Sequence, residues 1–259
     1  MDIIVYVIWC NEERRHKIAE QLKTLKIPYA INYFKASVPE NSKDYIIKNN
    51  EVPEKLQCCF RSHIRALHDY VVCYPDFKYI LILEDDVSLT IHDFVGKLKD
   101  VTRCYEDTPD IDYVSLGYLP TTISNVPIHL KLDGLTRKSG VFYDFKRADF
   151  TVWGSQAQLF SYKKAKTIVN ILFRNSGKLV LESVKDYLTK NSRFQNKAQH
   201  LMIDALLPLL FSQAIVCPPL VIEDNSSSTI HGDNKDRIES WKKSEKAGMF
   251  SFKDFFGLG

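Results

Sequence analysis

Two apolar segments with a helical pattern between them open the chain, and they constrain its fold more than any other feature. Residues 3–9 (IIVYVIW) form a continuous apolar run, which is typical of a strand buried on both faces of a sheet. Asn11 can then cap a helix over about 12–26 that ends before Pro28, and residues 29–35 (YAINYFK) predict a second strand. A strand, a helix and a strand in this order form a βαβ unit, so we expect a parallel sheet with helices on its faces.

The rest of the chain continues this alternation as far as a Ser-rich loop. Apolar stripes predict further helices over about 57–74, 91–106, 162–174, 181–190 and 199–212. Apolar runs predict strands at about 79–83, 112–116, 152–160 and 215–223. The last run contains Pro218 and Pro219, and proline cannot donate to a ladder, so we expect this strand at an edge of the sheet.

The organisation of the chain indicates one domain. The 259 residues contain no internal repeat and no low-complexity linker. We expect residues 1–232 to form the domain and the tail 233–259, which ends in the aromatic FSFKDFFGLG, to pack on it. The predicted fold class is therefore α/β: a single domain with a Rossmann-type, mostly parallel sheet flanked by helices.

The net charge and the cysteine content limit which classes of function and which cellular compartment we expect for the chain. The net charge is +3, far from the basic excess of a dedicated nucleic-acid-binding protein. We expect no transmembrane segment, and the N-terminus is typical of a buried strand instead of a signal peptide. These features predict a cytoplasmic protein, of bacterial or large-DNA-virus origin to judge from its many Lys, Ile, Asn and Tyr residues. In that compartment we expect free thiols at Cys10, Cys58, Cys59, Cys73, Cys104 and Cys217.

An acidic triplet carries the strongest chemical signal. The apolar strand 79–83 leads directly into Glu84-Asp85-Asp86, and ligands bind at the carboxyl ends of strands in open α/β sheets. Glu84 and Asp86 are two residues apart, so they can point the same way and share one Mg²⁺ or Mn²⁺ ion, while Asp85 faces elsewhere. Such an ion can stabilise a departing diphosphate. The structural alternative is that the triplet only solvates a turn and favours the start of the next helix.

At this point the chain resembles glycosyltransferase family 25, which includes lipooligosaccharide and collagen galactosyltransferases. The most specific likeness is a Ser-His helix, CCFRSHIRALHDYV at 58–71, followed by YILILEDDVSL at 79–89. Weaker likenesses follow in the family's order, at 112–118 (DYVSLGY), 154–169 (GSQAQLFSYKKAKTIV), 200–210 (HLMIDALLPLL) and 217–232 (CPPLVIEDNSSSTIHG). The chain departs from the family where Leu56-Gln57-Cys58 replaces the usual glycines before the Ser-His helix.

The resemblance implies a GT-A fold, a UDP-sugar donor, a divalent cation (Mn²⁺ or Mg²⁺) and inversion at the anomeric carbon. Galactose or glucose is the implied sugar, and a glycan or a hydroxylysine-type side chain of a protein is the implied acceptor. Asp86 and Glu84 are the predicted metal ligands, and His231 is the candidate that completes the metal site. The predicted contacts to the donor are Ser62, His63 and Asp85, and Gln156 and Asp149 are weaker candidates for contacts to the donor or the acceptor.

Asp204 is the candidate general base. It stands in an otherwise apolar helical segment, where burial of a carboxylate costs several kcal/mol unless it is paired or useful. Burial would also raise its pKa toward a useful range. The alternatives are structural: Asp204 can point to water, His63 can be a core histidine, and His231 can be a solvated loop residue. Arg14 and Arg15 can meet phosphate or simply be solvated.

Three other classes of protein compete with an enzyme of this kind. A zinc-binding module could use Cys59 and His63, which are four residues apart on one helix, with Cys58, His68 and Cys73 nearby. A phosphoacceptor receiver domain would need an aspartate where this chain has Gly117. A catalytically inactive relative could bind a nucleotide sugar as a binding module, although intact Glu84 and Asp86 argue against it. The sequence gives no indication of the oligomeric state.

Overall fold

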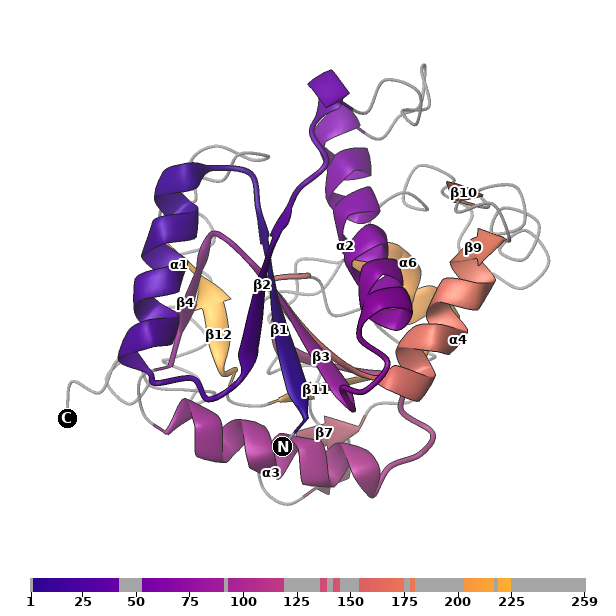
Figure 1. Ribbon diagram of the computed structural model, residues 1–259. Coiled ribbons are helices and arrows are strands. Elements are labelled where there is room, and N and C mark those ends of the chain that lie inside the picture. Colours follow the sequence, from indigo (N-terminus) through magenta and orange to yellow (C-terminus); the bar gives the residue numbers. More distant parts are fainter. Residues whose placement is uncertain are drawn as a thin grey trace.

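The computed structural model describes residues 2–41, 53–90, 93–118, 136–138, 142–144, 154–174, 178–179, 203–216 and 219–224. In these residues a ten-stranded mixed sheet lies between two layers of helices (Figure 1). Its strands are β1 Ile3–Trp9, β2 Ala30–Lys35, β3 Tyr79–Glu84, β4 Val87–Leu89, β5 Tyr113–Gly117, β6 Thr136–Lys138, β7 Phe142–Asp144, β8 Ala157–Ser161, β11 Gln213–Val216 and β12 Val221–Glu223. A separate two-stranded sheet contains β9 Phe173–Arg174 and β10 Lys178–Leu179.

The helices follow the predicted order. They are α1 Glu12–Thr24, the 3-10 turn Pro39–Asn41, α2 Glu54–Cys73, α3 Phe94–Glu106, α4 Tyr162–Leu172 and α6 Ile203–Leu210. Asn11 caps α1 as expected, because its side-chain oxygen accepts hydrogen bonds from the backbone N–H groups of Glu13 (2.9 Å) and Arg14 (3.3 Å). Among the helices of the described residues, none combines the length and the apolar character that crossing a membrane requires.

The main path of the sheet has the strand order β2-β1-β3-β8-β5-β11-β7-β6, and β12 joins it beside β5 and β4. The α/β class and the initial βαβ unit are confirmed, since β1 runs parallel to both β2 and β3. The sheet as a whole is mixed instead of mostly parallel, because β8 runs antiparallel to its neighbours β3 and β5. This reversal places the start of β8 at the same edge as the carboxyl ends of β1 and β3.

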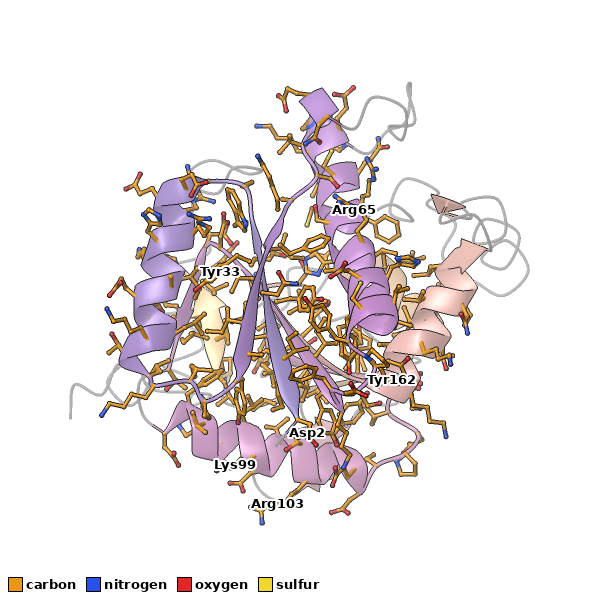
Figure 2. All side chains as sticks on the ribbon, in the orientation of Figure 1. Asp2, Tyr33, Arg65, Lys99, Arg103 and Tyr162 are labelled. Atoms are coloured by element: carbon orange, nitrogen blue, oxygen red, sulfur yellow. The ribbon has the colours of Figure 1, made fainter. Side chains whose placement is uncertain are left out.

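Alternate residues of the central strands build two separate cores. Figure 1 shows α1 on one side of the sheet and α2, α4 and α6 on the other. Helix α3 packs in the same core as α1. In β1, the residues Ile3, Val5 and Val7 pack in the α1–α3 core, whereas Ile4, Tyr6 and Ile8 pack in the core beneath the other helices. Side chains fill the two cores between the sheet and its helices, while Lys99 and Arg103 on α3 point away from the sheet (Figure 2).

One strand prediction needs correction. The run 215–223 is two strands, and neither is at an edge, because β11 lies between β5 and β7 and β12 lies between β5 and β4. Pro219 lies between the two strands, so it removes no N–H group from a ladder, and Pro218 is outside the described residues. The predicted helix 181–190 and the tail 233–259 lie outside the described residues.

Candidate active site

A cavity of about 360 Å³ opens at the carboxyl ends of β1, β2 and β3. The start of β8, the first turn of α6 and the end of β12 complete its wall. This is the edge at which open α/β sheets bind ligands. Seven of the eight predicted site residues line this one cavity: Ser62, His63, Glu84, Asp85, Asp86, Gln156 and Asp204. The eighth, His231, and the weaker candidate Asp149 lie outside the described residues.

Glu84 is the last residue of β3, and its side chain turns toward α2. The Oε1 atom lies 3.0 Å from Nε2 of His63 and accepts a hydrogen bond from Oγ of Ser155 at 2.5 Å. The Sγ atom of Cys59 lies 4.0 Å from the same oxygen. Three polar side chains therefore hold this carboxylate at the cavity wall, where its side chain is 22% exposed.

Asp85 faces the start of α1. Its Oδ2 atom accepts hydrogen bonds from the backbone N–H groups of Cys10 (2.9 Å) and Asn11 (3.2 Å). Burial raises the pKa of this carboxyl, whereas the two N–H groups and the nearby Arg14 guanidinium lower it. Asp85 therefore fixes the loop between β1 and α1 against the end of β3.

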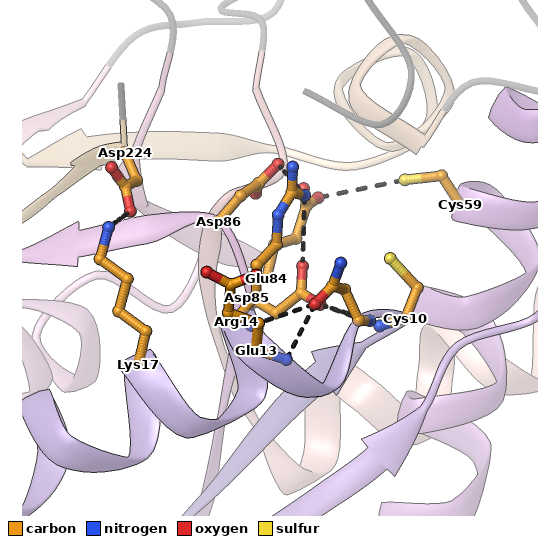
Figure 3. Close-up of polar contacts among 10 residues, drawn as sticks. Cys10, Glu13, Arg14, Lys17, Cys59, Glu84, Asp85, Asp86 and Asp224 are labelled. Carbon is orange, nitrogen blue, oxygen red and sulfur yellow. Dashed lines mark hydrogen bonds and ion pairs between the residues drawn. The ribbon is translucent and has the colours of Figure 1, made fainter. Parts of the chain in front are cut away.

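Asp86 faces Arg14, whose guanidinium lies 3.4 Å from one oxygen of Asp86 and 3.9 Å from Asp85 (Figure 3). Both side chains of the Arg14–Asp86 pair are 12% exposed. Burial raises the pKa of Asp86 to about 7, and the carboxylates of Glu84 and Glu223 add to that rise. The raised pKa shows that the neighbouring carboxylates outweigh the effect of the Arg14 guanidinium on Asp86.

Asp204 lies in the first turn of α6, half-buried in the cavity wall. Burial is the main cause that raises its pKa to about 6, and the Glu84 carboxylate adds to it. The backbone N–H of Gly154 donates to Asp204 and opposes this rise. Gly154 has φ 114°, a conformation that side chains rarely adopt, so a glycine is needed there.

The remaining two predicted contacts differ in what they offer a ligand. Ser62 is occupied within the protein, because its Oγ donates to the Cys58 carbonyl (2.7 Å) and accepts from the Ser37 N–H (2.8 Å). Gln156 is 5% exposed, and its side-chain oxygen has no hydrogen-bond partner among the described residues. A buried amide oxygen without a partner is costly, so a ligand hydroxyl or water is the group expected beside it.

Sequence reasoning missed several residues of the cavity. Ser155 donates a hydrogen bond to Glu84. Glu223 also lines the cavity, and it is the last residue of β12, just as Glu84 is the last residue of β3. A carboxylate directly after an apolar strand was the signal that identified Glu84, and the same signal was present at Glu223. Arg14, treated as solvated or phosphate-binding, instead contacts Asp85 and Asp86, whereas Arg15 pairs with Glu12 at 2.8 Å.

The chemistry of the cavity suits a hard divalent cation. Six acidic residues among the described residues line it, and four of them come from the end of β3 and the turn after it, from α6 and from the end of β12. Burial raises the pKa of two of these four carboxyls, Asp86 and Asp204, above the usual range. Oxygen ligands of this kind are the ones that Mg²⁺ and Mn²⁺ prefer. The carboxylates that could hold or face such an ion are Glu84, Asp86, Asp204 and Glu223.

Comparison with known proteins finds likeness in structure alone. No protein-family model matches the chain, and no curated protein matches its sequence. A glycosyltransferase involved in the glycosylation of the major capsid of PBCV-1 has 12% identity and a TM-score of 0.42, over 95% of this chain and 100% of that one.

Two further solved structures are similar to the chain to the same degree. The mannose-1-phosphate geranyltransferase from Thermus thermophilus has 10% identity and a TM-score of 0.43, over 86% of this chain and 75% of that one. The galactosyltransferase LgtC has 12% identity and a TM-score of 0.37, over 96% of both chains. At such identities and TM-scores, the chemistry of the cavity has to decide what the chain does.

Proposed function

We propose that the chain is a metal-dependent inverting glycosyltransferase that moves a hexose, galactose or glucose, from a UDP-sugar to a hydroxyl of a glycan or a hydroxylysine-type side chain. The observation that carries this proposal is the gathering of carboxylates in one cavity at the carboxyl edge of the sheet. A diphosphate would be repelled by these groups alone, so its binding there requires a divalent cation. The proposal includes membership of glycosyltransferase family 25, for which the motifs at 58–71 and 79–89 are the support.

The donor side of the cavity would use the groups around Glu84 and Asp86. These two carboxylates would hold Mn²⁺ or Mg²⁺, with His231 as the proposed third ligand. When bound, the cation neutralises the developing charge of the departing UDP. Arg14 would hold Asp86 in place from the other side, because the guanidinium lies 3.4 Å from that carboxylate.

The polar groups beside the metal ligands would orient the donor. Gln156 would accept a hydrogen bond from a donor hydroxyl through its unpartnered oxygen. Ser62 and His63 would shape the wall from α2, since Ser62 joins that helix to the backbone N–H of Ser37. Asp85 would contribute mainly by fixing the loop at Cys10, which also lines the cavity.

Asp204 would act as the general base. With a pKa of about 6, the carboxyl is mostly ionised at neutral pH and yet more basic than an exposed aspartate. An inverting transfer needs such a group to take the proton from the acceptor hydroxyl as that oxygen attacks the anomeric carbon. The cavity would leave room for the acceptor between Asp204 and the donor sugar.

The experiment is a thermal-shift panel of UDP-sugars with and without Mn²⁺, because a ligand that binds only the folded state raises the melting temperature. We expect UDP-galactose or UDP-glucose to stabilise the parent protein only when Mn²⁺ is present, and Asp86→Asn to abolish this effect. Asp110→Asn, an exposed residue outside the cavity, is the matched control and should behave as the parent. No stabilisation by any UDP-sugar with Mn²⁺ would contradict the proposal. Binding without release of UDP would instead favour the inactive nucleotide-sugar-binding relative.

A further inference from the structure

A second group of potential ligands lies at the wall of the cavity, and its chemistry differs from that of the carboxylates. Cys59 and His63 are four residues apart on α2, which places them on the same face of the helix. Glu84 approaches this face from the end of β3. Their three ligand atoms, a thiol sulfur, an imidazole nitrogen and a carboxylate oxygen, all lie within 4.8 Å of one another.

The spacing of these atoms is close to that of a bound zinc ion. Glu84 Oε1 lies 3.0 Å from Nε2 of His63 and 4.0 Å from Sγ of Cys59. With zinc–ligand bonds of about 2.0–2.3 Å in a tetrahedral site, ligand atoms lie about 3.3–3.5 Å apart. The two separations from Glu84 therefore need to change by only about half an ångström to match a zinc site, and the third, between Cys59 and His63, is at most 4.8 Å.

The surroundings of the cluster also fit a metal centre. Ser155 donates to Oε1 of Glu84 at 2.5 Å, and hydrogen bonds of this kind orient carboxylate ligands in metal sites. His63 is only 1% exposed, so its ring is held by packing, and all three residues line the cavity. Three protein ligands beside an open cavity leave a fourth position for water or a substrate atom.

We propose that Cys59, His63 and Glu84 form a three-ligand site for a thiophilic divalent cation, with Zn²⁺ as its natural occupant. Binding would release the thiol proton of Cys59 to solvent, so that the sulfur coordinates as a thiolate. Thiolate and imidazole ligands favour Zn²⁺ or Co²⁺, whereas oxygen ligands favour Mg²⁺ and Mn²⁺. The site therefore goes beyond the proposed function: it shares Glu84 with the proposed donor-cation site but selects another class of ion.

Cobalt provides a direct test, because a thiolate bound to Co²⁺ gives an intense near-ultraviolet charge-transfer band. The full-length, metal-free protein is titrated with Co²⁺ without air, in the presence of a reductant that is not a thiol. We expect the band to saturate at one ion per chain and to disappear when Zn²⁺ is added. No sugar donor is present, so the result does not depend on whether the chain transfers a sugar.

Variants test whether the charge-transfer band comes from the Cys59 thiolate. Cys59→Ser should remove it, whereas Cys73→Ser, at the exposed C-terminal end of the same helix, should retain it. Glu84→Gln should keep the thiolate band but weaken Co²⁺ binding at least about tenfold, which is a loss seen even for outer partners of metal ligands. Circular dichroism of each metal-free variant checks that it is folded.

Three outcomes would overturn the proposal: no charge-transfer band in the parent, a band that survives Cys59→Ser, or Glu84→Gln binding Co²⁺ as tightly as the parent. If Cys59→Ser does not fold, anomalous X-ray scattering at the zinc edge on parent crystals grown with Zn²⁺ decides the question. A peak between Cys59 and His63 supports the site, and a peak elsewhere or no peak contradicts it.

Discussion

The carboxylate of Asp85 accepts a hydrogen bond from the backbone N–H of Cys10 at 2.9 Å, and this contact joins the end of β3 to the start of α1. The same oxygen also accepts from the N–H of Asn11, the residue that caps α1. One side chain of the acidic triplet thus fixes the backbone at the cavity wall, while its two neighbours, Glu84 and Asp86, line the cavity and are the proposed ligands of the donor cation.

This contact predicts how two substitutions of Asp85 differ. Asp85→Ala leaves two backbone N–H groups without their acceptor, so we expect a loss of about 1–3 kcal/mol in the free energy of unfolding. Asp85→Asn keeps an acceptor oxygen and removes a carboxyl whose pKa burial raises, so the loss should be smaller. Urea unfolding of both variants measures the difference, and equal losses would show that the hydrogen bonds to Cys10 and Asn11 contribute little.

Asp86 should reduce the stability of the metal-free protein. Its pKa rises on folding to about 7, so between the ordinary value and pH 7 the folded state binds more protons than the unfolded state, and stability falls as the pH rises. We expect Asp86→Asn to stabilise the metal-free fold by about 1–4 kcal/mol at pH 8, and by less at pH 5. Thermal unfolding in a chelator at both pH values tests this, and a variant less stable than the parent at pH 8 would contradict it.

Asp204 should set the acidic limb of the pH profile of sugar transfer. A general base must be ionised, so with a pKa of about 6 we expect activity to fall as the pH drops below about 6. Burial is the main cause of the raised pKa of Asp204, and the neighbouring Glu84 carboxylate adds to it. The measurement is kcat against pH, and an unchanged rate at pH 5 would exclude Asp204 as the base.

Substitution of Asp204 should separate the proton-transfer step from binding of the UDP-sugar. Asp204→Asn keeps the size of the side chain but cannot accept the proton, so we expect kcat to fall about 10²–10⁴-fold. Mn²⁺-dependent stabilisation by the UDP-sugar should persist, because the proposed donor ligands are unchanged. A parallel loss of donor binding would place Asp204 in the donor site instead.

Gly117 allows β5 and β12 to lie close together. A Cβ atom at this position would lie 2.8 Å from the carbonyl oxygen of Val221, a backbone atom that cannot move aside alone. We expect Gly117→Ala to lower the free energy of unfolding by about 1–3 kcal/mol, the usual cost of overpacking. Chemical denaturation measures this cost, and a variant as stable as the parent would mean that the two strands can separate without loss.

Much of the fold could be predicted because its elements follow from local patterns. The apolar run of β1, the Asn11 cap and the carboxylates after β3 are short-range signals, and the strand-end rule placed Glu84 and Asp86 at the ligand-binding edge. The direction of β8 could not be predicted in this way. Strand direction depends on how the chain returns to the sheet, and no pattern within residues 157–161 encodes it.

The contacts that the site residues make with one another also could not be predicted from the sequence. Ser155 reaches Glu84 across 71 positions, and Arg14 reaches Asp86 across 72, so only the assembled sheet brings them together. The zinc-module alternative included Cys59 and His63 but lacked an oxygen ligand from another element. The structure brings the Glu84 carboxylate, at the end of β3, within 4.8 Å of the ligand atoms of both residues.

The most direct test of the central claim is the release of UDP from UDP-galactose and UDP-glucose by purified protein, with Mn²⁺ or with a chelator. We expect UDP release that requires the cation and that falls at least about 10²-fold in Asp86→Asn, as for loss of a group that stabilises the leaving charge. Asp110→Asn should retain the parent's rate. UDP release at the parent's rate by Asp86→Asn, or equal release in the chelator, would contradict the account.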